Sequence, residues 1–482
     1  MLGGAIKILL ILCGTAVATA QLAGVVHAMD LKQVLAAAYF NNPELDAARA
    51  RLRAIDENVS QAHGIFRPQV NARAANSATR TNTSGTGAAV IGGGEDGIGT
   101  ISTGGQLTTI ARSFSVTAEQ SLFRGLRSIN RLREAEAGVR AGQAQLLRVE
   151  QVVLFAAASA YANVIRDRRT FALRTEAVSS FNRRLGIIQR RFREKDVTAT
   201  DVAQARASLA EAQGDLATAA GELRASEASF ERIVGFPPRQ LDPAWVPRNQ
   251  LPDSLESALA FSEAENPAVI QALYLEQARR HTVDLIRGER YPDLSVVGSY
   301  DNDAFRNDIT DTNVNSLFVG LRVSVPLYDG GVIDSRVRQA KHDHVGTIQD
   351  IKTVRDLSRD AVKAYWGRLI AADGRRKAAL VRISTLREAL LGVDREEGVG
   401  QRSLLDVLEA QRTLIDAQIV AGSAERDIVI NTFGVLQAIG RMTAVKLGVT
   451  EMAYDPQVHY EEVRRKPWGA TITYEPTAKP AR

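Results

Sequence analysis

The chain has 482 residues, of which 45% are hydrophobic but only 6% are aromatic, and it holds 6 His and 1 Cys. Its 60 basic and 55 acidic residues are too evenly balanced to indicate nucleic-acid binding, and no basic tract with interleaved aromatic residues supports it. Long runs rich in Ala, Leu, Arg and Gln favour helix over sheet, so we expect a mainly α-helical protein.

The N-terminus has the pattern of an export signal. Lys7 precedes the apolar run ILLILCGTAVA, and Val26-His27-Ala28 offers a small-x-small cleavage pattern. We therefore predict a signal peptide over residues 1–28, because the apolar run is too short for a membrane span of about 20 residues. Cys13 lies inside this segment behind Leu12, which is too large for a lipoprotein signal. The mature chain would then have no cysteine, no disulfide and no lipid anchor.

The rest of the chain reads as a tandem repeat. A segment opening at Leu31 reaches Asn42-Pro43 and then Arg67-Pro68, and a second segment opening at Leu255 reaches Asn266-Pro267 and then Tyr291-Pro292. Three further landmarks recur at one constant offset of 205 residues: Gly125 and Gly330, Asp201 and Asp406, Gly235 and Gly440. An ordered series at constant offset indicates duplication. We predict a first repeat at 29–254, a second at 255–445, and a C-terminal tail at 446–482 that is extended or disordered.

Each repeat predicts the same order of elements. A short helix leads to a proline at a helix start, where the missing N–H costs little, and a helix of about 23 residues follows. A strand, a loop and a second strand come next, then a very long helix, a break, and another long helix.

The strand pattern is clearest over Asn315–Leu327, where apolar residues alternate with mostly polar ones. The first copy is weaker, because Arg112 shares the apolar face with Ile110, Phe114 and Val116. Such a segment fits either a membrane barrel strand of about 10 residues or a half-buried sheet in a soluble domain. The loop at Asn76–Gln106 contains IGGGEDGIG without a preceding strand and a following helix, so we expect a flexible surface loop and not a phosphate site. The apolar face consists of Leu317, Val319, Leu321, Val323, Val325 and Leu327.

The helices after Gly125 and Gly330 should run for about 60 residues, to near Arg193 and Glu397. At about 1.5 Å per residue each spans about 90 Å, too long for the wall of one compact domain. Both following helices keep a 3–4 spacing of apolar residues, from Val202 and from Val407 onwards. This spacing predicts supercoiled helices that pack side by side.

Two repeats supply four strands, which cannot close a barrel, since the smallest barrels have about eight. An open sheet edge in lipid would leave unpaired backbone groups at several kcal/mol each. If these strands enter a membrane, several chains must pool them, and the long helices would project from one side as a tube.

At this point the chain resembles the TolC-like outer-membrane efflux and secretion channels. The resemblance covers residues 30–445 and rests on the duplicated Asn-Pro segments, on VPLYDGG at 325–331, and on GQRSLLDVLEA at 400–410. It implies a homotrimer whose shared 12-strand barrel crosses the outer membrane and its lipid. It also implies long coiled-coil helices that form a periplasmic tube, reaching an adaptor protein and an inner-membrane ABC or proton-driven transporter.

The resemblance also assigns roles near the breaks between the long helices. Asp406 and Glu409, three residues apart on one helix face, fall where family members carry acidic rings at the periplasmic entrance. Arg402 and Asp201, with its neighbour Thr200, fall where neighbouring helices are tied together in the closed state. Glu397 stands where a tyrosine often joins those ties, so an added acid could loosen them. The bland alternative is a solvated coiled-coil face with chance acids.

Other functions fit poorly. No Ser/His/Asp arrangement has supporting context, and His342 and His344 are two apart on a helix, a poor metal pair. We therefore expect that the protein is not an enzyme and that it binds no cofactor, metal or nucleic acid. A structural coiled-coil filament would suit the helices but not the signal peptide or the alternating strand. For a channel, type I protein secretion and multidrug efflux both remain open as functions.

Overall fold

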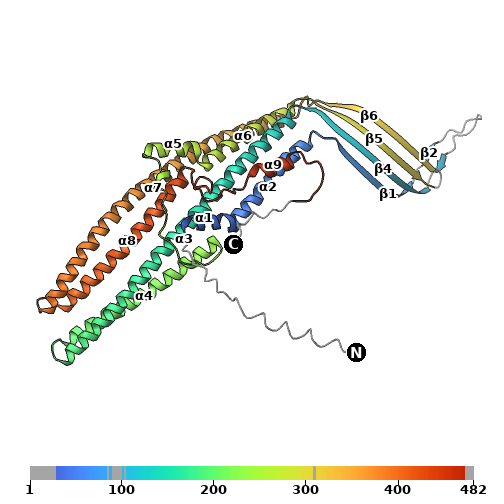
Figure 1. Ribbon diagram of the computed structural model, residues 1–482. Coiled ribbons are helices and arrows are strands. Elements are labelled where there is room, and N and C mark those ends of the chain that lie inside the picture. The colour runs from blue at the N-terminus through green and yellow to red at the C-terminus, as the bar shows by residue number, and fades with distance from the viewer. Residues whose placement is uncertain (1–28, 84–85, 89–99, 103–104, 308–310, 473–482) are drawn as a thin grey trace, which may run out of the picture. The chain divides into compact units, whose positions relative to one another are not determined.

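The computed structural model describes residues 29–83, 86–88, 100–102, 105–307 and 311–472 (Figure 1). The expected signal peptide, including Cys13, and the glycine-rich stretch at 91–99 lie outside the described residues. The described chain forms two compact units, each assembled from separate stretches of sequence. Of the described residues, the first unit takes those within 29–38, 156–247 and 371–430, and the second takes those within 39–155, 248–370 and 431–472.

The elements follow the same order in both halves of the sequence. The first half contains α1 (Leu31–Asn41), α2 (Pro43–Gly64), β1 (Gln69–Thr83), β4 (Gly105–Arg124), α3 (Arg127–Arg193) and α4 (Ala199–Val234). The second contains α5 (Leu255–Glu265), α6 (Pro267–Arg287), β5 (Asp293–Arg306), β6 (Asp311–Ser324), α7 (Val332–Gly398) and α8 (Leu404–Ala438). The helices α3 and α7 have 67 residues each, so the expected long helices are confirmed. Short 3₁₀ turns lie at Arg248–Gln250 and Gly288–Arg290, and α9 spans Pro456–Arg464.

The second unit contains an antiparallel sheet with the order β1-β4-β5-β6 (Figure 1). The strands are long, and Gln69 pairs with Glu119, Arg124 with Asp293, and Asp293 with Ser324. In this sheet β1 and β6 are the two edge strands.

The expected strand limits were partly wrong. The last strand begins at Asp311 and ends at Ser324, because Pro326 cannot donate to a strand ladder. Val325 and Leu327 therefore lie beyond it. The expected loop was too long as well, since β1 continues to Thr83 and a two-stranded ribbon pairs β2 (Thr86–Ala88) with β3 (Thr100–Ser102).

Asn-Pro pairs start the helices α2 and α6. The side chains of Asn42 and Asn266 accept hydrogen bonds from the backbone N–H groups of Glu44 at 2.9 Å and Ala268 at 2.8 Å. The proline that follows each asparagine occupies the first helical turn, as the sequence predicts.

Two glycines, Gly125 and Gly288, let two stretches of backbone approach each other closely next to the strands. Gly125 has φ +60°, and a Cβ there would collide with the carbonyl oxygen of Gly288. A Cβ on Gly288 would in turn lie 2.5 Å from the carbonyl oxygen of Gly125. Neither position has room for a side chain.

The tail is not wholly extended, which corrects the expectation for residues 446–482. Asp455 caps α9 by accepting from Gln457 N at 2.9 Å, and Pro456 opens the helix. Val463 is buried, and the His459 ring contacts the buried carboxylate of Asp56 on α2 at 2.9 Å. The Asp-Pro start, the buried Val463 and the contact between His459 and Asp56 together hold this helix against α2.

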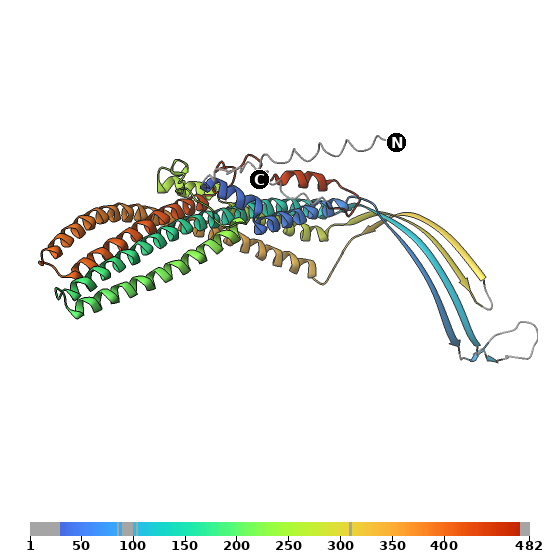
Figure 2. The ribbon, with the colours of Figure 1, turned by 60° about the horizontal axis from the view of Figure 1, so that its bottom comes forward.

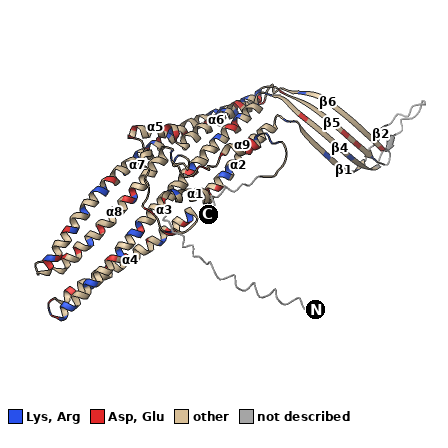
Figure 3. Cartoon of the chain, in the orientation of Figure 1, with Lys and Arg blue, Asp and Glu red and all other residues tan. Residues whose placement is uncertain are grey.

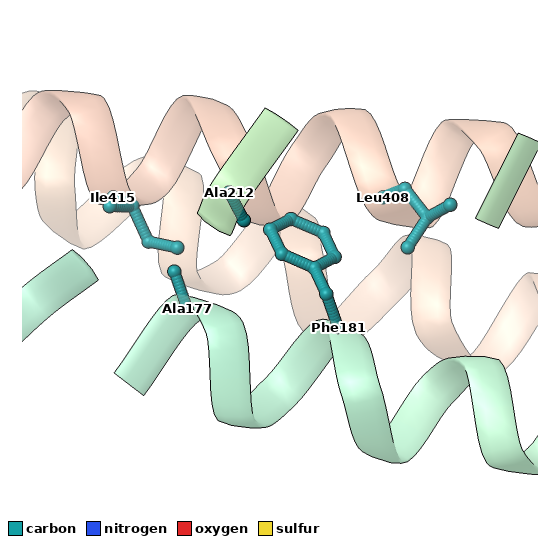
Figure 4. Packing of buried hydrophobic residues seen from close by; sticks show 5 residues of the cluster. All are labelled: Ala177, Phe181, Ala212, Leu408 and Ile415. Atoms are coloured by element: carbon teal, nitrogen blue, oxygen red, sulfur yellow. The ribbon is translucent and has the colours of Figure 1, made fainter. Parts of the chain in front are cut away.

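The first unit contains two helical hairpins (Figure 2). One is formed by α3 from Ala156 onwards with α4, and the other by α7 from Ala371 onwards with α8 up to Ile430. The predicted heptads face the interior, with Val202, Ala205, Ala212 and Val407 all buried. Phe181 of α3 packs with Ala212 of α4 and with Leu408 of α8 (Figure 4). The hairpins therefore share one apolar seam. Across the stretches that the structure describes, no helix has both the length and the apolar character needed to cross a membrane.

Candidate functional site at the turns between the long helices

The candidate site is the pair of turns that join the long helices in the first unit. The first turn connects Arg193 to Ala199, and the second connects Gly398 to Leu404. Lys195 and Gly400 have φ values of +61° and +76°, so each chain reversal uses one left-handed residue. Basic and acidic residues are both present along all four helices that lead to these turns (Figure 3).

The repeated acids Asp201 and Asp406 start the returning helices. Asp201 Oδ2 accepts from the backbone N and the hydroxyl of Thr198, both at 2.8 Å, and Thr198 Oγ1 accepts from Asp201 N at 3.3 Å. Ser403 and Asp406 make the same three hydrogen bonds, at 3.0, 2.8 and 3.2 Å. Both turns thus end in a capping box, which satisfies backbone donors at a helix start.

These bonds also keep the two acids charged. The hydrogen bonds from the backbone and hydroxyl of Thr198 lower the pKa of Asp201, and those from the Ser403 hydroxyl and backbone lower the pKa of Asp406. Nearby arginines add to both shifts. The negative charge at each helix start therefore persists below the usual carboxylate range.

The sequence placed Glu409 and Thr200 in the same site, and both lie on its surface. Glu409 is exposed one turn after Asp406, and its backbone oxygen accepts from Thr413 Oγ1 at 2.8 Å. Thr200 is exposed in the first turn of α4. Of the two candidate ring acids, Glu409 projects into solvent while Asp406 is occupied by its cap.

Arg402 and Glu397 make different kinds of contact. Arg402 Nε lies 3.1 Å from Glu396 Oε2, so it closes the turn within the α7–α8 hairpin. Glu397 Oε1 lies 2.6 Å from Arg191 on α3 and therefore joins the two hairpins. Arg191 also holds Asp196 at 2.6 Å, and its pKa is raised by the bonds to Asp196 and Glu397.

Sequence reasoning missed the arginine side of this site. Arg174 of α3 contacts Asp215 of α4 at 3.1 Å and Asp416 of α8 at 3.2 Å, so one guanidinium links three helices. Its partners lie 41 and 242 residues away along the chain, and no local spacing of residues predicts such a contact. The capping boxes were also missed, although Thr198-x-x-Asp and Ser403-x-x-Asp are local signals that could have predicted them.

Comparison with known proteins identifies the class. The family model "Outer membrane efflux protein" matches residues 34–236 and 261–441. The chain is 32% identical over 446 residues to the outer membrane efflux protein BepC of Brucella suis, covering 91% of both chains. It is 25% identical over 431 residues to the outer membrane protein TolC of Escherichia coli, covering 86% of this chain and 83% of TolC. The structure of the Campylobacter jejuni CmeC outer membrane channel matches with a TM-score of 0.73 at 15% identity, covering 90% of this chain and 89% of CmeC.

Fold and comparisons together define an outer-membrane channel with a periplasmic extension, and not an enzyme. The chain belongs to the outer membrane efflux protein family. It is an outer-membrane efflux channel of tripartite systems, and its helical turns are the candidate entrance.

Proposed function

We propose that three copies of this chain form one channel and pool their strands in a common barrel. The observation that carries the proposal is the pair of sheet edges, because β1 and β6 each have one neighbour among the described strands. Three four-stranded sheets supply twelve strands, more than the roughly eight of the smallest closed barrels. Joining β1 of one copy to β6 of the next would satisfy the backbone groups of both edges.

The side chains of β6 support a lipid-facing wall. Leu317, Val319, Leu321 and Val323 are 64–78% exposed in the single chain. They alternate with Phe318, Gly320 and Arg322, so the opposite face of β6 is mostly polar or small with one aromatic exception. Such a face is suited to outer-membrane lipid and unsuited to water.

We propose further that the helical turns form the gated periplasmic entrance. Three copies of Glu409, with Asp406 one turn away, would surround the mouth with carboxylates that favour cations. Arg191 and Glu397 would hold neighbouring hairpins together in the closed state. A periplasmic adaptor and an inner-membrane transporter would open the mouth by binding the separated arrangement better.

The proposed cargo is protein delivered by a type I secretion transporter of the ABC class. The chain's one cysteine, Cys13, follows Leu12, which argues against the lipid-anchored form of drug-efflux channels. Multidrug efflux driven by a proton-coupled pump is the alternative. The similarity to the Brucella suis outer membrane efflux protein supports efflux in general. Deleting the gene and measuring both secreted protein and drug susceptibility separates the two.

The entrance assignment is tested in planar bilayers with single-residue changes. Glu409→Gln should lower cation selectivity and weaken block by multivalent cations, since it removes an exposed charge without shortening the side chain. Ser403→Ala is the matched control, because it removes the cap while leaving both acids in place. Selectivity and block that stay unchanged in Glu409→Gln and in Asp406→Asn would remove the ring from the proposal.

The trimer is tested separately from the ring. Purified protein in detergent should migrate at about three times the 52.2 kDa chain mass and shift to the monomer only after heating. A stable monomer without conductance would contradict the pooled barrel.

A further inference from the structure

The segment that follows α9 carries an exposed tryptophan near the end of the sheet at which β1 begins. Trp468 is 86% exposed, and Ile472 four residues later is 83% exposed. Large apolar side chains so exposed on a short segment point to a binding surface.

This segment is held in a defined place. Arg67, two residues before β1, donates to the backbone oxygens of Arg465 at 3.3 Å and Lys466 at 3.4 Å. Ser60 of α2 donates to the same Lys466 oxygen at 3.4 Å. The ammonium group of Lys466 donates to the oxygen of Thr471 at 3.2 Å and closes the segment into a loop. Trp468 is thereby displayed at the apex, two residues from an anchored position.

The anchor fixes the level of Trp468 relative to the sheet. Arg67 precedes the start of β1, and the register puts the end of β4, the start of β5 and the end of β6 at the same end of the sheet. Exposed aromatic residues cluster at this end, at positions Phe66, Phe123, Tyr291 and Tyr328. In membrane barrels such aromatic girdles mark the boundary between hydrocarbon and water.

Cationic groups accompany the tryptophan. Arg465 is exposed, and the hydrogen bonds given above take Arg67 and Lys466 to neutral backbone carbonyls. A tryptophan at the level of the headgroups, next to basic residues, suits anionic lipid.

We propose that the loop Arg465–Ile472 docks on the periplasmic leaflet of the outer membrane and binds anionic phospholipid headgroups. Trp468 enters the interfacial region, and Arg465 with Arg67 faces the phosphates. The inference rests on insertion of the strands in the outer membrane, and it adds a second membrane contact outside the barrel.

The test uses the emission of Trp468 in the full chain. Only two other tryptophans exist, and Trp245→Phe with Trp366→Phe leaves Trp468 as the one reporter. The protein is reconstituted in vesicles of phosphatidylcholine with or without phosphatidylglycerol, and shallow-brominated lipid serves as the quencher. We expect emission to move to shorter wavelengths than in detergent, with at least twofold stronger quenching when phosphatidylglycerol is present.

Charge reversal provides the matched comparison. Arg465→Glu should abolish the phosphatidylglycerol dependence, whereas Arg190→Glu, an exposed charge near the end of α3, should leave it intact. Equal access of aqueous iodide to Trp468 in vesicles and in detergent would overturn the proposal. The proposal would also be overturned if quenching by brominated lipid did not depend on phosphatidylglycerol, or if Trp468 were protected from iodide only when an adaptor protein is added. Heat-modifiable migration and conductance, measured on the same samples, report barrel insertion independently.

Discussion

Replacing Glu397 with Gln should shift the channel towards its open state. The change keeps the size of the side chain but removes the ion pair at 2.6 Å that joins α7 to Arg191 of α3. Arg191 keeps its bond to Asp196, so the first turn should stay folded. If the pair exists only in the closed arrangement, its loss raises the closed state in free energy and leaves the open state unchanged.

The magnitude follows from the exposure of the two side chains. Glu397 is 15% exposed and Arg191 is 34% exposed, which puts the pair close to the surface class worth about 0.5–1 kcal/mol. Such a loss changes the ratio of open to closed channels by about two- to fivefold for each copy. Because three copies would act on one mouth, we expect the trimer to respond at least that strongly.

Single-channel recording in planar bilayers measures the open fraction directly. Glu396→Gln is the matched control, since it removes the same charge one residue earlier and breaks only the contact to Arg402 inside one hairpin. A double-mutant cycle with Arg191→Gln isolates the pairwise contribution. Equal open fractions for Glu397→Gln and Glu396→Gln, or a cycle energy near zero, would refute the assignment of Glu397 as a tie between hairpins.

Three further changes probe the scaffold. Thr198→Ala should destabilise the start of α4 by about 1 kcal/mol, seen as faster amide exchange in its first turn and not elsewhere. Gly440→Ala should prevent normal assembly, because φ is +78° and the new Cβ would collide with the carbonyl oxygen of Glu265; heat-stable trimer yield measures it. Burial raises the pKa of Asp56, so its contribution to stability is favourable below its unfolded pKa of about 3.9 and is lost as the pH rises through the folded value. Asp56→Asn should therefore raise the melting temperature more at pH 7 than at pH 4, and the opposite trend would indicate that pairing with His459 dominates.

What the sequence could predict depended on distance along the chain. Pro43 and Pro267 locate helix starts through their own backbone, and the heptads that begin at Val202 and Val407 require a partner helix whatever its identity. These local signals were enough to predict the long helices, and the alternation of apolar and polar residues was enough to predict the strands. The bond between Arg191 and Glu397 spans 206 residues. The repeat offset of 205 residues places the two at nearly equivalent positions of the two copies, but it does not predict that their side chains meet.

The recurring pair Asp201 and Asp406 shows a second limit of prediction from the sequence. Sequence comparison drew attention to Asp201 and Asp406 because they recur, and the resemblance gave them roles at an entrance. In the folded chain both carboxylates first serve their own helices, through Thr198 and Ser403. The two acids recur for a local physical reason, because each one caps the start of its own helix. This reason is independent of whether the acids also form a ring. The roles at an entrance stay predictions.

The contacts between the hairpins suggest why the entrance could open at low cost. A buried ion pair broken by losing one partner costs about 3–5 kcal/mol, because a charge is stranded. Arg174 holds Asp416 of the other hairpin, but it also holds Asp215 of its own, and Arg191 likewise has both Glu397 and Asp196. When the hairpins separate, each arginine keeps one acid within its own hairpin.

The acids released by that movement are in a position to be solvated. Asp416 is 45% exposed already, and Glu397 lies next to the exposed turn at Gly400, so water can replace the lost guanidinium. Other ion pairs join the hairpins as single pairs, among them Arg169 with Glu425 and Arg184 with Asp394, and both side chains of each pair are at least one-fifth exposed. Under the proposed gating, such ion pairs would hold the closed state in register, and each broken contact would cost about 1 kcal/mol or less. A partner that binds the separated hairpins must supply enough binding free energy to offset the sum of these small losses. It must also offset the cost of loosening or covering the apolar seam around Phe181.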